Sequence, residues 1–179
     1  MAHIELDDTV PGLPSLLRFR PETAGPLTAL AEALLRGPSP LERGERELIA
    51  AYVSELNGCR FCASSHGACA AVQLPGGMSL VEAVHADLAA APVSGRLRTL
   101  LGIAAAVQRG GREVGDPHIA AARGAGATDV EIHDTVLIAA AFCMYNRYVD
   151  GLATGVPSDP AAYARMAERI TAHGYGAAR

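Results

Sequence analysis

Hydrophobic positions along the chain recur every three or four residues, and no segment alternates hydrophobic and polar residues over a useful length. This spacing predicts amphipathic helices and no strands of consequence. Leu48, Tyr52 and Leu56, for example, fall on one face of residues 41–56. Proline, glycine and capping residues mark the helix ends. The expected helices are 26–36, 41–56, 59–74, 79–91, 94–109, 116–123, 128–153 and 159–173.

Residues 1–25 lack this periodicity. They contain Pro11, Pro14 and Pro21 among short apolar pairs, which predicts an arm laid over the surface. Residues 26–179 then form a single helical domain, whose core motif lies in 41–74. Two stretches, 48–72 and 132–156, each carry an apolar run, a cysteine and small residues. Their weak similarity leaves an internal duplication of helical halves open.

Composition agrees with an all-α fold. Half of the 179 residues are hydrophobic and 19% are charged, which excludes a disordered chain. Aromatic residues make up only 4% and tryptophan is absent, so the core must be aliphatic. Runs of alanine favour closely packed helices over sheets. The length is that of one domain with a substantial core.

Charge and hydropathy exclude several partners. The net charge is −4, all 15 basic residues are arginine, and they form no cluster, so nucleic acid and anionic membranes are poor partners. The acidic N-terminus has no apolar signal core. The longest apolar run, Val136 to Tyr145, has ten residues, about half of the ~20 that span a bilayer. We therefore expect a cytoplasmic protein.

Two closely spaced cysteines carry the candidate chemistry. In a reducing compartment such a pair is more often catalytic or metal-binding than structural. Cys59 and Cys62 fall in or beside the first turn of a predicted helix, and His66 lies on the same face. A helix N-terminus stabilises a thiolate, and C-x-x-C thiols there have a lowered pKa. Such a thiolate can attack a substrate and then close a disulfide, while His66 can take or pass a proton.

Glu47 joins this group through the geometry of a helix hairpin. It lies ten residues before the Asn57–Gly58 break, and His66 lies eight after it. If the two helices pack antiparallel, both residues lie at about the same level, and Glu47 can orient His66. The alternative is a solvated helix residue. Because Glu47 is expected on a helix surface, Glu47→Gln should lower the rate and cost little stability.

The intervals between these residues resemble a known family. Cys59 follows Glu47 by 12 positions, Cys62 follows by 3 more and His66 by 4 more. This is the motif of the alkylhydroperoxidase D (AhpD)-like family, within the carboxymuconolactone decarboxylase superfamily. The wider pattern resembles that superfamily's uncharacterised peroxidase-related branch over nearly the whole chain, including Phe19-Arg20-Pro21-Glu22 and Asn146-Arg147.

The resemblance implies an all-helical, homo-oligomeric peroxidase without cofactor or metal. Cys62 would attack the peroxide and become a sulfenic acid, Cys59 would be its resolving partner and proton donor, and Glu47 and His66 would form the proton relay. The partners would be a small peroxide and an unidentified dithiol or protein thiol reductant. AhpD itself has a histidine where this chain has Phe61, so the relay or the reductant would differ here. The lactone decarboxylases of the superfamily lack the cysteine pair, which argues against that activity.

Other interpretations remain open from the sequence. Cys59, Cys62 and His66 could hold zinc if Cys69 were a fourth ligand, although Cys69 and Cys143 fit small buried hydrophobic positions better. Asn146, Arg147 and Asp150 follow an apolar run; they mark either a helix emerging to solvent or an interface, or the lining of the active pocket. A thiol–disulfide oxidoreductase and a non-enzymatic redox sensor are the alternative functions.

Overall fold

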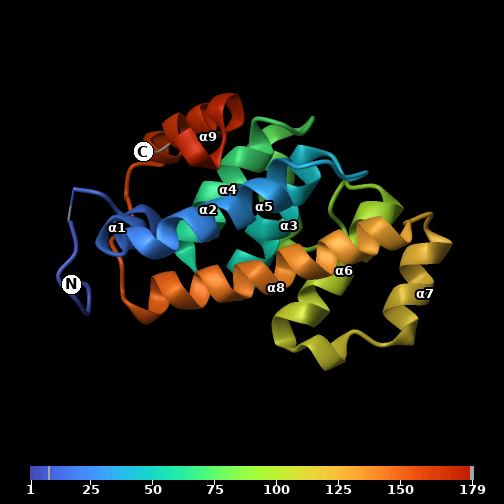
Figure 1. The fold of residues 1–179 in the computed structure, drawn as a ribbon. Coiled ribbons are helices and arrows are strands. Elements are labelled where there is room, and N and C mark those ends of the chain that lie inside the picture. Colours follow the sequence, from blue (N-terminus) through green and yellow to red (C-terminus); the bar gives the residue numbers. More distant parts are fainter. Residues whose placement is uncertain (8, 178–179) are drawn as a thin grey trace.

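The computed structural model of the chain describes residues 1–7 and 9–177, and within them it contains helices and no strand, which confirms the all-α prediction (Figure 1). The α-helices are α1 (Leu13–Phe19), α2 (Pro21–Arg36), α3 (Arg43–Leu56), α4 (Arg60–Ala71), α5 (Gly77–Ala86), α6 (Gly95–Arg109), α7 (Asp116–Gly124), α8 (Asp129–Gly151) and α9 (Pro160–His173). Two short 3-10 helices are η1 (Gly111–Glu113) and η2 (Tyr175–Ala177).

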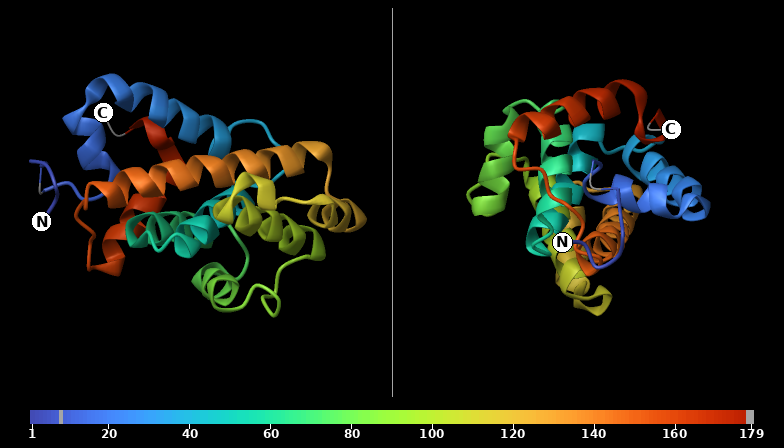
Figure 2. Two further views of the ribbon diagram at one scale, coloured as in Figure 1. Left: turned by 90° about the horizontal axis from the view of Figure 1, so that it is seen from below. Right: turned by 90° about the vertical axis from the view of Figure 1, so that its left-hand side faces the viewer.

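The antiparallel hairpin of α3 and α4 is the centre of the molecule. The long helix α8 packs against α3, with α2 beside its C-terminal half and α6 beside its N-terminal half (Figures 1 and 2). Helix α9 covers α4. The main core is aliphatic and joins α3, α6 and α8. Its fully buried side chains include Leu48, Ile49, Leu100, Leu101 and Ile138.

A second, smaller core surrounds the start of α4. Here Cys59, Phe61 and Cys62 pack against Leu16 from α1, Val149 from α8 and side chains of α9. The cysteine pair therefore lies where the two ends of the chain fold back over the hairpin. Within the described residues, no helix combines the length and apolarity that crossing a membrane requires.

The N-terminal region differs from the prediction of an irregular arm. Residues 13–19 form α1, and α2 begins at Pro21 and continues through Pro26, so the expected break between residues 25 and 26 is absent. Pro14 and Pro21 occupy the first turns of these helices, where a missing N–H costs nothing. Leu16 is fully buried, so α1 is part of the second core.

Helix ends agree with the sequence where a side-chain cap forms. Ser94 accepts a hydrogen bond from the Leu97 amide at 3.1 Å, and Thr128 forms a capping box with Glu131, as predicted. The prediction for Ser79 is wrong, because α5 already begins after Gly76, whose φ of 98° allows a sharp turn. Helix α5 also ends early. The guanidinium of Arg98 holds the carbonyls of residues 88, 89, 91 and 93 in a turn.

The two similar stretches of sequence adopt different structures. Residues 48–72 cover the end of α3, the turn and α4, whereas residues 132–156 cover one continuous helix and the loop after it. Their similarity is therefore one of composition rather than of a repeated helical unit.

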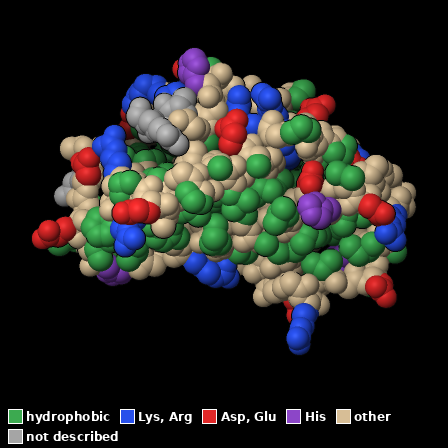
Figure 3. All heavy atoms as spheres, viewed as in Figure 1, with side chains coloured by type: hydrophobic (Ala, Val, Ile, Leu, Met, Phe, Trp, Pro, Cys, Tyr) green, Lys and Arg blue, Asp and Glu red, His purple; other side chains and the backbone are tan. Residues whose placement is uncertain are grey.

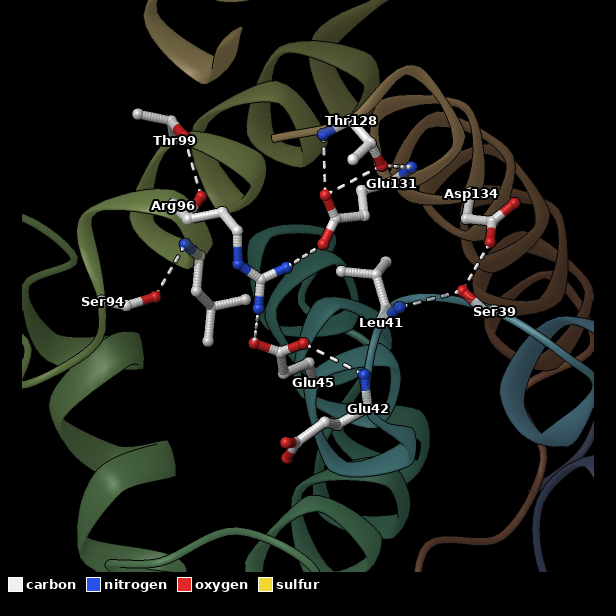
Figure 4. A network of polar contacts seen from close by, with 11 residues as sticks. Ser39, Leu41, Glu42, Glu45, Ser94, Arg96, Thr99, Thr128, Glu131 and Asp134 are labelled. Carbon is white, nitrogen blue, oxygen red and sulfur yellow. Dashed lines mark hydrogen bonds and ion pairs between the residues drawn. The ribbon is translucent and has the colours of Figure 1, made fainter. Parts of the chain in front are cut away.

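A buried ionic network fixes the N-termini of α3 and α8. Glu45, in the first turn of α3, accepts a hydrogen bond from the Glu42 amide at 3.1 Å, and Glu131 accepts one from the Thr128 amide at 2.7 Å (Figure 4). The guanidinium of Arg96, from α6, forms an ion pair with each carboxylate. One arginine thereby joins three helices.

Candidate active site

The turn between α3 and α4 places both cysteines at the start of α4. Asn57 ends α3, Gly58 takes a φ of 72°, and Cys59 is the N-cap residue of α4. The Cys59 amide is held by the Ser54 carbonyl at 2.9 Å. Cys59 is 0% exposed and Cys62 is 3% exposed, and both are free thiols. The predicted placement in the first helical turn is confirmed.

The surroundings give the two thiols opposite acidities. A hydrogen bond from the Cys59 thiol lowers the pKa of Cys62; burial opposes this, while the charge of His66 and a hydrogen bond from Asn146 reinforce it. The same thiol–thiol hydrogen bond, together with burial, raises the pKa of Cys59. Cys62 is therefore the thiol that ionises first.

Glu47 and His66 meet across the hairpin. The Nδ1 of His66 lies 2.7 Å from the Oε2 of Glu47. Glu47 is only 2% exposed, so its interpretation as a solvated helix residue is wrong. The ring of Phe142, from α8, packs edge-on against the imidazole with centroids 4.5 Å apart. Glu47 and Phe142 therefore hold the imidazole from two sides.

Tyr175, from η2, completes this group and was missed by the sequence analysis. Its hydroxyl donates a hydrogen bond to the Oε1 of Glu47 at 2.6 Å and lies 3.3 Å from the Nδ1 of His66. The phenol and the imidazole are stacked, with centroids 6.0 Å apart. Tyr175 lies far outside the motif, and no spacing or pattern in the sequence distinguishes it from the other tyrosines.

A polar pocket opens beside the cysteine pair. Asn57, Asn146, Arg147, Asp150 and Gly151 line a cavity of about 400 Å³. Asn146 lowers the pKa of Cys62, and Asp150 raises that of Cys59. Asn146 is 1% exposed. The polar residues after the apolar run of α8 thus line a pocket at the C-terminal end of this helix.

Asn146 is fixed in a chain of side-chain amides and hydroxyls. Its Nδ2 donates to the Ser54 hydroxyl at 3.0 Å, and its Oδ1 accepts from the Asn57 amide at 2.8 Å. Gln108, from α6, donates to the side-chain Oδ1 of Asn57 at 3.0 Å. This network orients the amide that faces Cys62.

The sequence profile of the carboxymuconolactone decarboxylase family matches residues 21–73 and 75–154, well over half of the chain. The chain belongs to this family. No curated protein matches it in sequence.

Two solved structures that are similar to this chain are described as peroxidase-related proteins. An uncharacterized peroxidase-related protein from Silicibacter sp. TM1040 is 31% identical, with a TM-score of 0.77 over 87% of this chain and 79% of that one. A protein described as an alkylhydroperoxidase AhpD core, from Ralstonia eutropha JMP134, is 27% identical, with a TM-score of 0.77 over 88% and 81%. A protein of unknown function from Agrobacterium tumefaciens, 23% identical with a TM-score of 0.69 over 80% and 97%, shares the fold.

Three further residues considered from the sequence, Cys69, Cys143 and Phe61, lie outside the Cys59–Cys62 pair. Burial raises the pKa of Cys69, which is fully enclosed, and Cys143 accepts a hydrogen bond from Asn57 at 3.6 Å. The ring of Phe61 packs against Tyr163, with centroids 6.3 Å apart, and lies directly over Gly12. Among residues 1–7 and 9–177, no three His, Cys, Asp or Glu side chains are grouped so as to hold a metal ion.

Proposed function

We propose that this protein is a thiol peroxidase that reduces organic hydroperoxides or hydrogen peroxide with Cys62 as the attacking thiol. The observation that carries the proposal is geometric: two buried free thiols lie at the start of α4, and Glu47 holds His66 at 2.7 Å one helical turn after Cys62. The Cys59 thiol and the charge of His66 lower the pKa of Cys62. The family and the two solved structures named as peroxidase-related support an antioxidant role.

In the first step the Cys62 thiolate attacks one peroxide oxygen. An S–O bond forms as the O–O bond breaks, so the sulfur is oxidised to a sulfenic acid and the peroxide is reduced. The leaving alkoxide becomes an alcohol, or water from hydrogen peroxide, by taking up the proton that Cys62 gave up. His66, oriented by Glu47 at 2.7 Å, carries this proton.

In the second step Cys59 attacks the sulfur of Cys62. An S–S bond forms, the S–O bond breaks, and the leaving hydroxide takes the Cys59 proton to become water. The raised pKa of Cys59 keeps it protonated until Cys62 has been oxidised, because the hydrogen bond that it donates to the thiolate is lost at that point. A small dithiol, or a protein thiol once the helices over the pair have moved, then reduces the disulfide in a two-electron exchange.

Burial of the pair favours a small oxidant. Cys59 and Cys62 are 0% and 3% exposed, so a protein disulfide cannot reach either sulfur without rearrangement of the surrounding helices. The cavity of about 400 Å³ is lined by Asn146 and Asp150, which also influence the pKa values of the pair, and it offers a small hydroperoxide an approach to the thiols. A thiol–disulfide oxidoreductase is therefore less well supported than a peroxidase.

Rapid-mixing measurement of peroxide consumption tests the proposal. Protein reduced with a small dithiol should consume hydrogen peroxide, tert-butyl hydroperoxide or cumene hydroperoxide catalytically, and Cys62→Ser should abolish the consumption. Cys143→Ser is the matched control, because it replaces a cysteine outside the pair and should turn over normally. Stoichiometric oxidation without turnover, or turnover only with a protein disulfide, would contradict the peroxidase.

We also propose that the chain assembles with copies of itself. Val130, Leu137 and Met144 are exposed and recur every seven residues on one face of α8. Hydrophobic side chains gather on the face over which α8 runs (Figure 3). A second copy would cover this apolar strip. Light scattering should give a mass that is a multiple of 18.5 kDa, and the monomer mass at all concentrations would contradict it.

A further inference from the structure

The Glu47 carboxylate makes a hydrogen bond with each of its two oxygens. Oε2 faces the Nδ1 of His66 at 2.7 Å, and Oε1 accepts from the Tyr175 hydroxyl at 2.6 Å. A buried carboxylate must be compensated by donors to stay ionised. Burial and the adjacent Glu47 charge raise the pKa of Tyr175 well above its ordinary value, so the phenol keeps the proton that it donates.

The Tyr175 oxygen also faces the imidazole. A hydroxyl donates one hydrogen bond and accepts others, and here its proton is directed to Glu47. Its lone pairs are then available to the Nδ1 of His66 at 3.3 Å. Two acceptors, from Glu47 and Tyr175, therefore surround one ring nitrogen. This arrangement favours a proton on Nδ1 and leaves Nε2 free to exchange a proton.

The segment that carries Tyr175 is anchored to α2 and α9. The Tyr175 amide donates to the Oε2 of Glu32 at 2.8 Å, and the Oε1 of Glu32 pairs with Arg36 at 3.1 Å. The same guanidinium binds the carbonyls of Ile170 and Thr171, each at 3.1 Å, near the end of α9. The backbone that carries the phenol is thus fixed by the Glu32–Arg36 ion pair, which is separate from the Cys59–Cys62 pair.

From this geometry we propose that Tyr175 is a positioning residue, which fixes the Glu47 carboxylate and, through it, the tautomer and orientation of His66. The proposal rests on the proposed function, because it assigns Tyr175 a role in the proton relay of that same site. The Tyr175 hydroxyl makes its hydrogen bonds to Glu47 and His66, not to Cys59 or Cys62. It acts on Cys62 only through Glu47 and His66.

Tyr175→Phe tests this role, with Tyr145→Phe as the matched control. Tyr145 likewise donates its buried hydroxyl, to the Leu27 carbonyl at 2.8 Å, but contacts neither Glu47 nor His66. Loss of a hydrogen bond to a charged group should lower peroxidase turnover by about 10- to 100-fold in Tyr175→Phe. Because the hydroxyl favours the ionised carboxylate, the acid limb of the pH profile should also move toward higher pH. Tyr145→Phe should leave turnover and profile unchanged.

The rate of Cys62 alkylation by iodoacetamide as a function of pH, followed by peptide mass spectrometry, separates the two proposals. This rate depends on the charge of His66 and needs no peroxidase activity. In Tyr175→Phe it should fall below neutral pH relative to the wild type and to Tyr145→Phe. If the wild type has no peroxidase activity but this shift is seen, the function fails and the positioning role stands. If Tyr175→Phe loses only thermal stability, with both pH profiles unchanged, the positioning role is wrong.

Discussion

Glu45 and Glu47 are two buried carboxylates on α3, only two residues apart, that meet different partners. Glu45 binds the guanidinium of Arg96 and a backbone amide at the end of its own helix. Glu47 binds the imidazole of His66 and the phenol of Tyr175. Both carboxylates are held by hydrogen bonds, but only the second group contains a side chain that exchanges a proton near neutral pH.

The difference shows how the partner decides the role of a buried carboxylate. A guanidinium is permanently charged, so the Glu45–Arg96–Glu131 network cannot move a proton and serves to join α3, α6 and α8 (Figure 4). Glu47 instead supports an imidazole whose charge lowers the pKa of the Cys62 thiol. We infer a structural role for the first group and a chemical role for the second.

Glu47→Gln should have the largest effect. Glutamine keeps an acceptor for His66 but removes the charge that supports a protonated imidazole, so turnover should fall by about 10²–10⁴-fold, the usual contribution of general acid–base catalysis. Because Glu47 is buried, we also expect a loss of about 1–2 kcal/mol in the free energy of unfolding, more than for a solvated residue. Steady-state kinetics and urea denaturation measure the two effects. Full activity with an unchanged pH profile would remove Glu47 from the relay.

Glu45→Gln should show the reverse pattern. The variant leaves Arg96 with one carboxylate instead of two, and the free energy of unfolding should fall by about 1–3 kcal/mol. Turnover per folded molecule should stay at the wild-type level, because Glu45 contacts neither His66 nor the cysteines. Kinetics and denaturation of the two glutamine variants, measured side by side, give this comparison. Loss of turnover in folded Glu45→Gln would show that the two groups are coupled.

The smallest expected effect is the loss of folding stability at acid pH as the Glu45–Arg96–Glu131 network is protonated. Burial alone would raise the pKa of Glu131, but hydrogen bonds from Thr128 and the charge of Arg96 outweigh it and lower the pKa below its ordinary value of 4.5. A carboxyl group whose pKa is lower in the folded state stabilises the fold at pH values above its unfolded-state pKa. This contribution disappears as the pH falls through its folded-state pKa.

Urea denaturation at a series of pH values below about 5 measures this contribution. The wild type should lose stability as the pH falls, and Glu131→Gln, although less stable at neutral pH, should lose less over the same range. Equal slopes for both proteins would show that Glu131 is not held in its ionised form.

Much of the site follows from local sequence. The Asn57–Gly58 turn, the cysteine spacing and the distance to Glu47 all describe one helix hairpin, so helix geometry alone brings Glu47 level with His66. Tyr175 was not predictable, because its approach depends on how the segment after α9 packs on α2. The pocket role of Asn146 likewise depends on the packing of α8 against the hairpin.

The fold shows the same division. Ser94 and Thr128 act through hydrogen bonds within one turn, so their helix starts were predicted correctly. Helix α1 was missed because prolines mark both irregular segments and first turns of helices. The early end of α5 depends on Arg98, whose side chain reaches back from the next helix. The two features that were missed, α1 and the end of α5, depend on tertiary contacts rather than on local propensity.

The proposed cycle assigns attack on the peroxide to Cys62 and resolution of the product to Cys59. Its most direct test is mass spectrometry of Cys59→Ser after one equivalent of hydrogen peroxide, with a sulfenic-acid probe present. We expect the probe to label Cys62 and the variant to complete one turnover and then stop, whereas the wild type should form a Cys59–Cys62 disulfide. Labelling of Cys59 in Cys62→Ser, with none of Cys62 in Cys59→Ser, would contradict it.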